Sequence, residues 1–98
     1  MPIKTLSTSA EELVPENRLR TSLAIQNEDA TINMFIKFEK PGNTTVSSTD
    51  HDHRLAAGDV IGLNKLVDGK EQVQARVTII AASGTPIVSF FETEEERR

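Results

Sequence analysis

Apolar and polar residues alternate along much of this chain, and the alternation predicts β-strands. In TSLAIQN (21–27), Leu23 and Ile25 fall on one side and small or polar residues on the other. This is typical of a strand with one buried face, because successive side chains of a strand point to opposite faces. TINMFIKF (31–38) alternates in the same way after the short polar stretch 27–30. The two runs are therefore predicted to form a β-hairpin.

The second half of the chain predicts three further strands. VIGL (60–63) follows Gly58-Asp59, which is a turn signal, and IVSFF (87–91) follows the turn sequence SGTP. EQVQARVTIIAAS (71–83) alternates over most of its length, with five residues on one apolar face: Val73, Ala75, Val77, Ile79 and Ala81. Short strands separated by turns predict an all-β fold, either a small antiparallel β-sandwich of jelly-roll type or a barrel.

The two ends of the chain are predicted to lie outside this β domain. Residues 1–12 are mostly small and polar, and they are interpreted as a flexible, extended N-terminal arm that docks on a neighbour. STSAEEL (7–13) also resembles a helix capping box, although Pro15 limits any helix there to one or two turns. The domains are thus predicted as the arm, a sandwich over 13–92, and a solvated charged tail over 93–98.

One stretch inside the predicted domain lacks a clear strand pattern. Lys40 to His53 is polar and rich in turn-forming residues, and Val46 is its only large apolar residue. It is predicted to be a long loop with one short strand near Thr44–Ser47.

Composition narrows the function classes. A chain of 98 residues with four Phe and no Trp or Tyr has a small core, so we expect a partner surface or a homo-oligomer to add stability. The absence of cysteine excludes disulfides and zinc–thiolate sites. A net charge of −4 without a basic patch argues against binding to nucleic acid or to anionic membranes. With no apolar run of about 20 residues and no apolar leader, the protein is expected to be made in a cytoplasm.

The sequence DHDH (50–53) is the strongest candidate for a chemical site. His51 and His53 would share one face of a strand, and a His-x-His pair is similar to the metal motif of cupins. That motif continues with a Glu where this chain has Ala57 or Gly58, and no third histidine exists in the chain. A structural or surface role is favoured for both histidines. A metal site and a pH-sensitive contact with a neighbouring chain remain alternatives, and no cofactor is predicted.

Other catalytic patterns are missing from the sequence. There is no cysteine and no Gly-x-Ser-x-Gly nucleophile motif, and the paired glutamates lie near the ends rather than across a rigid cleft. We therefore predict that the protein is not an enzyme. The residues interpreted as candidates for contacts with a partner are two apolar residues of the arm and three arginines: Ile3, Leu6, Arg18, Arg20 and Arg54.

Four phrases, in their order along the chain, resemble small β-sandwich virion proteins of tailed bacteriophages. They are LVPENRLRTSLAIQN, TINMFIKF, HRLAAGDVIGL and ARVTIIAASGTPIVSFFE, which together cover about residues 13–92. The chain departs from the family pattern in two places, with Ala57 in place of a proline and Phe35 in place of a tyrosine.

This resemblance implies a capsid decoration, or cement, protein that binds the outside of a phage head and stabilises it. Its partner would be the major capsid protein, its location the virion surface, and its oligomeric state a homotrimer. A tail-associated or receptor-binding phage module is the first alternative, and a small cupin-like metal-binding protein is the second.

Overall fold

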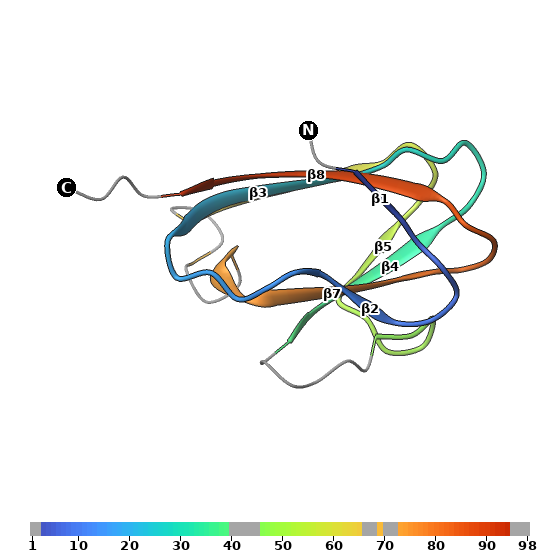
Figure 1. Cartoon of the computed structure of the whole chain (residues 1–98), viewed down its shortest axis with the longest axis horizontal. Coiled ribbons are helices and arrows are strands. Elements are labelled where there is room, and N and C mark those ends of the chain that lie inside the picture. Colours follow the sequence, from blue (N-terminus) through green and yellow to red (C-terminus); the bar gives the residue numbers. More distant parts are fainter. Residues whose placement is uncertain (1–2, 40–45, 66–68, 70–72, 95–98) are drawn as a thin grey trace.

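Two antiparallel sheets make up the computed structural model, which describes residues 3–39, 46–65, 69 and 73–94. Sheet A has the strand order β1-β8-β3-β6, and sheet B has the order β2-β7-β4-β5. In Figure 1 the strands β3 and β8 of sheet A lie above β7 and β4 of sheet B. The strands are β1 (Ile3–Thr5), β2 (Glu11–Val14), β3 (Arg20–Asn27), β4 (Met34–Glu39), β5 (His53–Leu55), β6 (Val60–Asn64), β7 (Arg76–Ala81) and β8 (Ile87–Glu94).

The strand order is that of a jelly roll. Every connection between consecutive strands crosses from one sheet to the other except the connection from β4 to β5. This pattern produces two facing four-stranded sheets from one chain. The prediction of a small antiparallel sandwich of jelly-roll type is confirmed, and the barrel alternative is not adopted.

The core lies between the two sheets and follows the predicted alternation. Leu23 and Ile25 of β3 face Met34 and Ile36 of β4, and all four are almost fully buried. Burial of a Leu, Ile or Met side chain contributes about 1.5–3 kcal/mol. On β7, the inward residues Val77, Ile79 and Ala81 are buried as predicted. That strand begins at Arg76 rather than at residue 71, and Val73, although fully buried, has helical backbone.

The predicted hairpin between 21–27 and 31–38 is wrong. Both strands exist, but β3 pairs with β6 and β8 in sheet A, whereas β4 pairs with β5 and β7 in sheet B. The chain crosses between the sheets at Asn27, whose buried side-chain amide donates to the carbonyl oxygens of Ile32 (2.7 Å) and Leu55 (3.0 Å). Alternation and a short polar connection suit a sheet crossing as well as a hairpin, so they could not distinguish the two.

The N-terminal segment belongs to the sandwich rather than forming a separate arm. β1 pairs with β8, and β2 pairs with β7. Between them, Leu6 is 1% exposed, and its backbone N–H donates to the carbonyl oxygen of Pro86 at 2.9 Å. The helical turn considered at 7–13 is also wrong, because residues 11–14 are a strand. The composition of residues 1–12 does not reveal these two strands, because the strands that pair with them, β8 and β7, come from the other end of the chain.

For two other predicted segments, the structure describes only some of the residues. β8 continues to Glu94, so the first residues of the predicted charged tail are strand, and residues 95–98 lie outside the described residues. The predicted short strand near Thr44–Ser47 falls partly outside them as well, and Val46 and Ser47 are not in a strand. The predicted turn at Gly58 is present, where a φ of 79° favours glycine.

Candidate functional site: an uncharged outer sheet face

The outer face of sheet A is built from uncharged side chains. Strand pairing places Phe91 beside Ala24 and Ala24 beside Gly62, and pairing also aligns Ser89 with Gln26 and Ile3. Since residues that pair across strands point to the same side, one set of residues forms this face. We call this set the neutral face: Ile3, Thr5, Ser22, Ala24, Gln26, Val60, Gly62, Asn64, Ile87, Ser89, Phe91 and Thr93.

Among the residues that the structure describes, the large apolar side chains that are exposed all lie on the neutral face. Ile3 is 66% exposed, Val60 60%, Phe91 49% and Ile87 42%, and all four belong to this face. At its border, the carboxylate of Glu28 accepts a hydrogen bond from the hydroxyl of Ser89 at 2.9 Å. A gathered apolar patch on a sheet surface is typical of an interaction site, whereas single exposed apolar residues are ordinary.

Gly62 makes a shallow position in this face. A methyl group placed on its Cα would have no heavy atom within 4 Å, so the space above it is open. Ala24, its neighbour across the strand pair, is also small, and Phe91 stands on the far side of Ala24. The neutral face therefore has a protruding ring and a depression in the same row.

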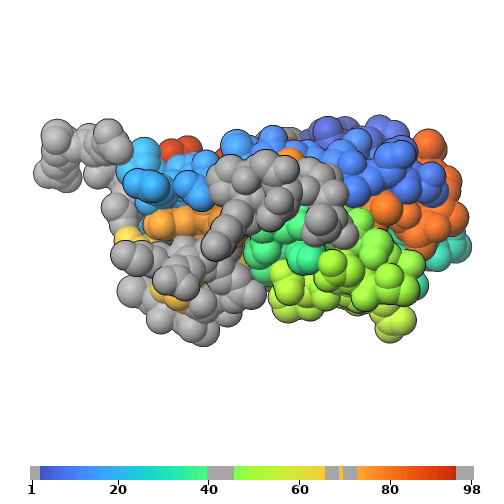
Figure 2. Space-filling model, turned by 90° about the horizontal axis from the view of Figure 1, so that it is seen from below, coloured from blue at the N-terminus to red at the C-terminus, as the bar shows by residue number. Residues whose placement is uncertain are grey.

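The outer face of sheet B has a different character, because it is charged and internally paired. Arg76 Nε lies 2.7 Å from Glu12 Oε1, and Lys37 Nζ lies 2.8 Å from Asp50 Oδ2. The hydrogen bond and the charge of Asp50 raise the pKa of Lys37 above 10.5. Figure 2 views the molecule from this side, where β5 and the loop before it are light green. Paired charges on an exposed sheet contribute little stability but keep such a face soluble.

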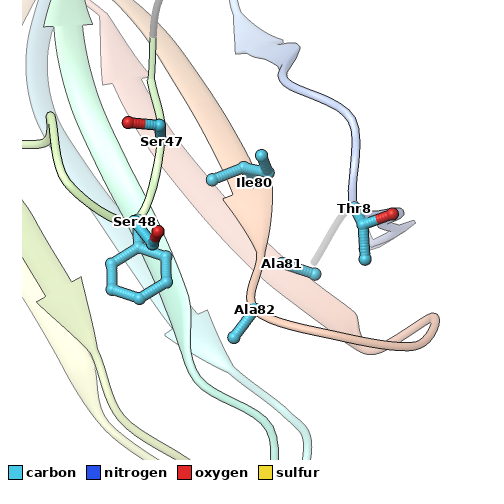
Figure 3. Close-up of a pocket in the computed structure, with 7 residues that line it drawn as sticks. Thr8, Ser47, Ser48, Ile80, Ala81 and Ala82 are labelled. Atoms are coloured by element: carbon cyan, nitrogen blue, oxygen red, sulfur yellow. The ribbon is translucent and has the colours of Figure 1, made fainter.

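A hollow of about 220 Å³ lies next to this charged face. Its lining comes from the β1–β2 connection, from the loop before β5 and from the end of β7, and Figure 3 shows the hydroxyl-bearing residues Thr8, Ser47 and Ser48 around Ile80 and Ala82. Phe35 completes the lining. The Ser47 hydroxyl oxygen accepts the backbone N–H groups of Thr49 and Asp50, so the hydroxyls of Thr8 and Ser48 are the groups that could hold a small polar ligand beside the ring.

The two histidines do not converge. The ring of His51 contacts Phe35 (4.6 Å between ring centroids), and the ring of His53 contacts Phe38 (5.7 Å). Phe35 and Phe38 are three residues apart on β4, so they point to opposite faces of sheet B. The prediction that both imidazoles share a face is therefore wrong, because His51 precedes β5 and only His53 is in the strand. Among the residues that the structure describes, no cluster of three or more His, Asp or Glu could hold a metal.

Arg20 is not a surface residue, which corrects its interpretation as a partner-binding candidate. Its side chain is fully buried, and its Nε donates to Glu92 Oε2 at 2.6 Å. Its two terminal nitrogens donate to three backbone carbonyl oxygens: those of Val73 (2.9 Å), Ala75 (3.0 Å) and Pro15 (2.7 Å). Each of these hydrogen bonds is made within the protein. Arg20 is the first residue of β3, and its side chain points between the two sheets. It joins the end of β8 to the segments that precede β3 and β7.

The other predicted contact residues fall in different places. Leu6 is in the core, which removes it as a contact residue, whereas Ile3 lies on the neutral face. Arg18 is exposed in the loop before β3, with Nε 3.7 Å from Glu16 Oε1, and Arg54 is exposed on β5. The structure therefore does not bring the predicted set together into one site.

Sequence reasoning missed the neutral face although its signal is present in two runs. The non-core positions of TSLAIQN are Ser22, Ala24 and Gln26, and those of IVSFF are Ile87, Ser89 and Phe91. An exposed strand face usually carries charged residues, so a run whose outward positions are all uncharged is informative. That the two runs pair with each other was not visible in the sequence.

Comparison of the chain with protein-family models, with curated proteins and with solved structures found no match. In the part of the chain that the structure describes, no helix has the length and apolar character of a membrane span.

Proposed function

We propose that this chain is a structural virion protein, a capsid decoration protein that binds the outside of a phage head and stabilises it. The resemblance over residues 13–92 supports this function, with the major capsid protein as the partner. The jelly roll is compatible with it, because viral capsid domains use this architecture, as lectins and cupins also do. Since one fold serves many functions, the argument depends on the surface rather than on the fold.

The observation that carries the proposal is the neutral face. Four large apolar side chains are exposed on it and none of its residues is charged. Its remaining positions are hydroxyls, amides and small residues, which can be buried against protein without leaving a charge unpaired. A protein that works by binding needs such a surface.

Stabilisation of a shell would follow from binding alone. A protein that binds the assembled shell but not its dissociated subunits shifts the equilibrium toward the shell by mass action. Each contact can be weak when many copies bind neighbouring positions of one lattice, because linked contacts raise the effective concentration. The mechanism that we propose is therefore binding at many sites, with no chemical step.

The test uses phage heads that lack the protein, to which purified protein is added back. We expect added protein to co-sediment with the heads and to raise the temperature or chelator concentration at which they disrupt, measured by light scattering. Phe91→Lys places a charge on the neutral face and should lose this protection, whereas Thr49→Lys, in the exposed loop before β5 and outside the lining of the hollow, should keep it. Equal resistance with and without wild-type protein would contradict the proposal.

The tail-associated or receptor-binding alternative draws on a different feature, the hollow lined by Thr8, Ser47, Ser48 and Phe35. A recess with hydroxyl groups and a ring suits a ligand better than a flat lattice contact. Electron microscopy of virions carrying labelled protein would distinguish the two functions, because density on the tail would favour the alternative over head decoration.

A further inference from the structure

We propose that the neutral face binds the neutral face of a second copy of this chain, so that two copies form a dimer whose two-fold axis runs along β3. This inference uses the same face that is proposed to contact the phage head. Because one face cannot hold both partners at once, the dimer is a reversible state of the free protein and dissociates when a copy binds the head. A two-fold dimer would replace the trimer expected from the sequence resemblance. Three properties of the face support a second copy as its occupant.

The first property is charge. The chain has a formal net charge of −4, so two copies repel each other unless their charges lie away from the contact. The residues of the neutral face meet that condition, since all of them are uncharged. The nearest acidic group is Glu28 at the end of β3, whose carboxylate is held by a hydrogen bond from Ser89. A strongly charged partner would bury its own charges there without counter-charges, which is costly. An uncharged face is complementary to itself.

The second property is shape. Phe91, Ala24 and Gly62 form one row across β8, β3 and β6, with Ala24 in the middle. Consider a two-fold axis that runs along β3 in the plane of the contact. It places β8 of one copy over β6 of the other copy. Phe91 then lies over Gly62 of the partner subunit, and the same contact repeats in the opposite direction, as a two-fold interface requires. The open space above Gly62 receives the protruding ring.

The neighbouring rows obey the same operation. Gln26 and Ser22 lie on β3, so each faces its own copy across the axis, and amide or hydroxyl groups can both donate and accept hydrogen bonds there. Thr93 on β8 is brought toward Asn64 of the partner subunit, which is another uncharged polar pair. No row formed by residues of the neutral face places like charges opposite each other. Glu28, which directly follows β3 and accepts a hydrogen bond from Ser89, is the acidic group that this operation brings toward its own copy.

The third property is size. Because β1 lies outside β8, an axis along β3 leaves Ile3 and Thr5 beyond the sheet of the partner subunit, and the other residues of the neutral face make the contact. Each residue of a sheet face covers a patch of about 4.8 by 6.8 Å, so this contact covers on the order of 300 Å² on each copy. Stable interfaces bury about 800 Å² on each partner, and smaller ones belong to weak complexes. The predicted dimer is therefore reversible, with a dissociation constant on the order of 100 µM.

Sedimentation equilibrium of the purified full chain tests this inference. We expect the mass to rise with concentration from 10.8 kDa toward twice that value. Gly62→Glu and Phe91→Lys should each weaken dimerisation about tenfold or more, because each places a charge in the apolar contact. Gly62 has an ordinary backbone conformation and open space, so its substitution is not expected to unfold the protein.

The double variant Gly62→Glu with Phe91→Lys gives the decisive measurement of dimerisation. The proposed two-fold axis brings the introduced carboxylate of each copy to the introduced ammonium of the other, so dimerisation should recover relative to both single variants. Thr49→Glu and Thr49→Lys, which make the same charge changes in the exposed loop before β5, should dimerise like wild type. Circular dichroism of every variant checks the fold.

Three outcomes would overturn the dimer: a monomer up to about 1 mM, a trimer, or a double variant no better than its single variants. A monomeric wild type that still protects phage heads would contradict this inference while leaving the proposed function intact. A protein that forms the dimer but neither binds nor protects phage heads would contradict the proposed function while leaving this inference intact.

Discussion

Nε of Arg20 lies 2.6 Å from Oε2 of Glu92, at a point where the Arg20 side chain is fully buried and the Glu92 side chain is 31% exposed. The same guanidinium holds the carbonyl oxygens of Pro15, Val73 and Ala75. One side chain thus connects the end of β8 to two segments that are far apart in the sequence. Hydrogen bonds donated by a buried guanidinium, together with apolar packing, therefore close this end of the sandwich.

Arg20→Ala should destabilise the protein by about 3–5 kcal/mol, because it leaves Glu92, the buried carbonyl oxygen of Val73 and two partly buried carbonyl oxygens without their donor. Urea denaturation followed by circular dichroism measures this loss. Arg18→Ala, two residues earlier and exposed, is the matched control and should change stability by less than about 0.5 kcal/mol. A loss at Arg20 no larger than at Arg18 would contradict the role of this network.

Asn27→Ala should cost about 2–4 kcal/mol, since it removes the donor to two carbonyl oxygens and the acceptor of the Asp29 backbone N–H. Asn27 holds the chain where it crosses between the sheets, so the loss should appear in the same urea measurement. Gln26→Ala, one residue earlier on the outer face, should stay close to wild type in stability. If both substitutions cost the same, the amide of Asn27 has no special role.

Leu6→Ala and Ile3→Ala form a pair that tests the N-terminal segment. Leu6 is 1% exposed and Ile3 is 66% exposed. Removing the buried side chain should cost about 2–5 kcal/mol, whereas removing the exposed one should cost less than about 1 kcal/mol. A small cost at Leu6 would instead show that the segment behaves as the flexible arm expected from its composition.

Asp29 should titrate at unusually low pH. The backbone N–H groups of Thr31 and Ile32 donate to its carboxylate and hold its pKa below the ordinary value of 3.8. Folding therefore favours the ionised form, so its contribution to stability is present above pH 3.8 and is lost as the pH falls through the lower folded-state pKa.

The carboxyl carbon shift of Asp29, followed by NMR, should have a midpoint below 3.8 in the folded protein. Asp29→Asn keeps an oxygen acceptor but cannot ionise. The stability difference between wild type and this variant should therefore shrink as the pH falls below 3.8. A folded-state midpoint at or above that value would contradict the hydrogen-bonding explanation.

Addition of Zn²⁺ or Ni²⁺ should leave the melting temperature unchanged, because His51 and His53 contact phenylalanines on opposite faces of sheet B. Two separated imidazoles do not make a chelating site. Differential scanning fluorimetry of untagged protein is sufficient, with His51→Ala and His53→Ala as references. A rise in melting temperature that disappears in both variants would restore the metal-site alternative.

The alternation of apolar and polar residues was sufficient to locate most strands and to identify which of their residues face the core. Alternation is a local property, and it placed Leu23, Ile25, Val77 and Ile79 in the core that the structure shows. It also predicted an all-β fold, either a sandwich or a barrel, because alternating runs bury one face against a second sheet or inside a sheet closed on itself.

The tertiary structure alone decided which strands pair, and the candidate site depends on that pairing. Phe91 and Gly62 are neighbours in one row only because β3 lies between β8 and β6. The burial of Leu6 and Arg20 likewise depends on contacts with Pro86 and Glu92, far along the chain. Pairing is set by packing between distant segments, which periodicity does not encode, so the neutral face could be recognised only after the chain had folded.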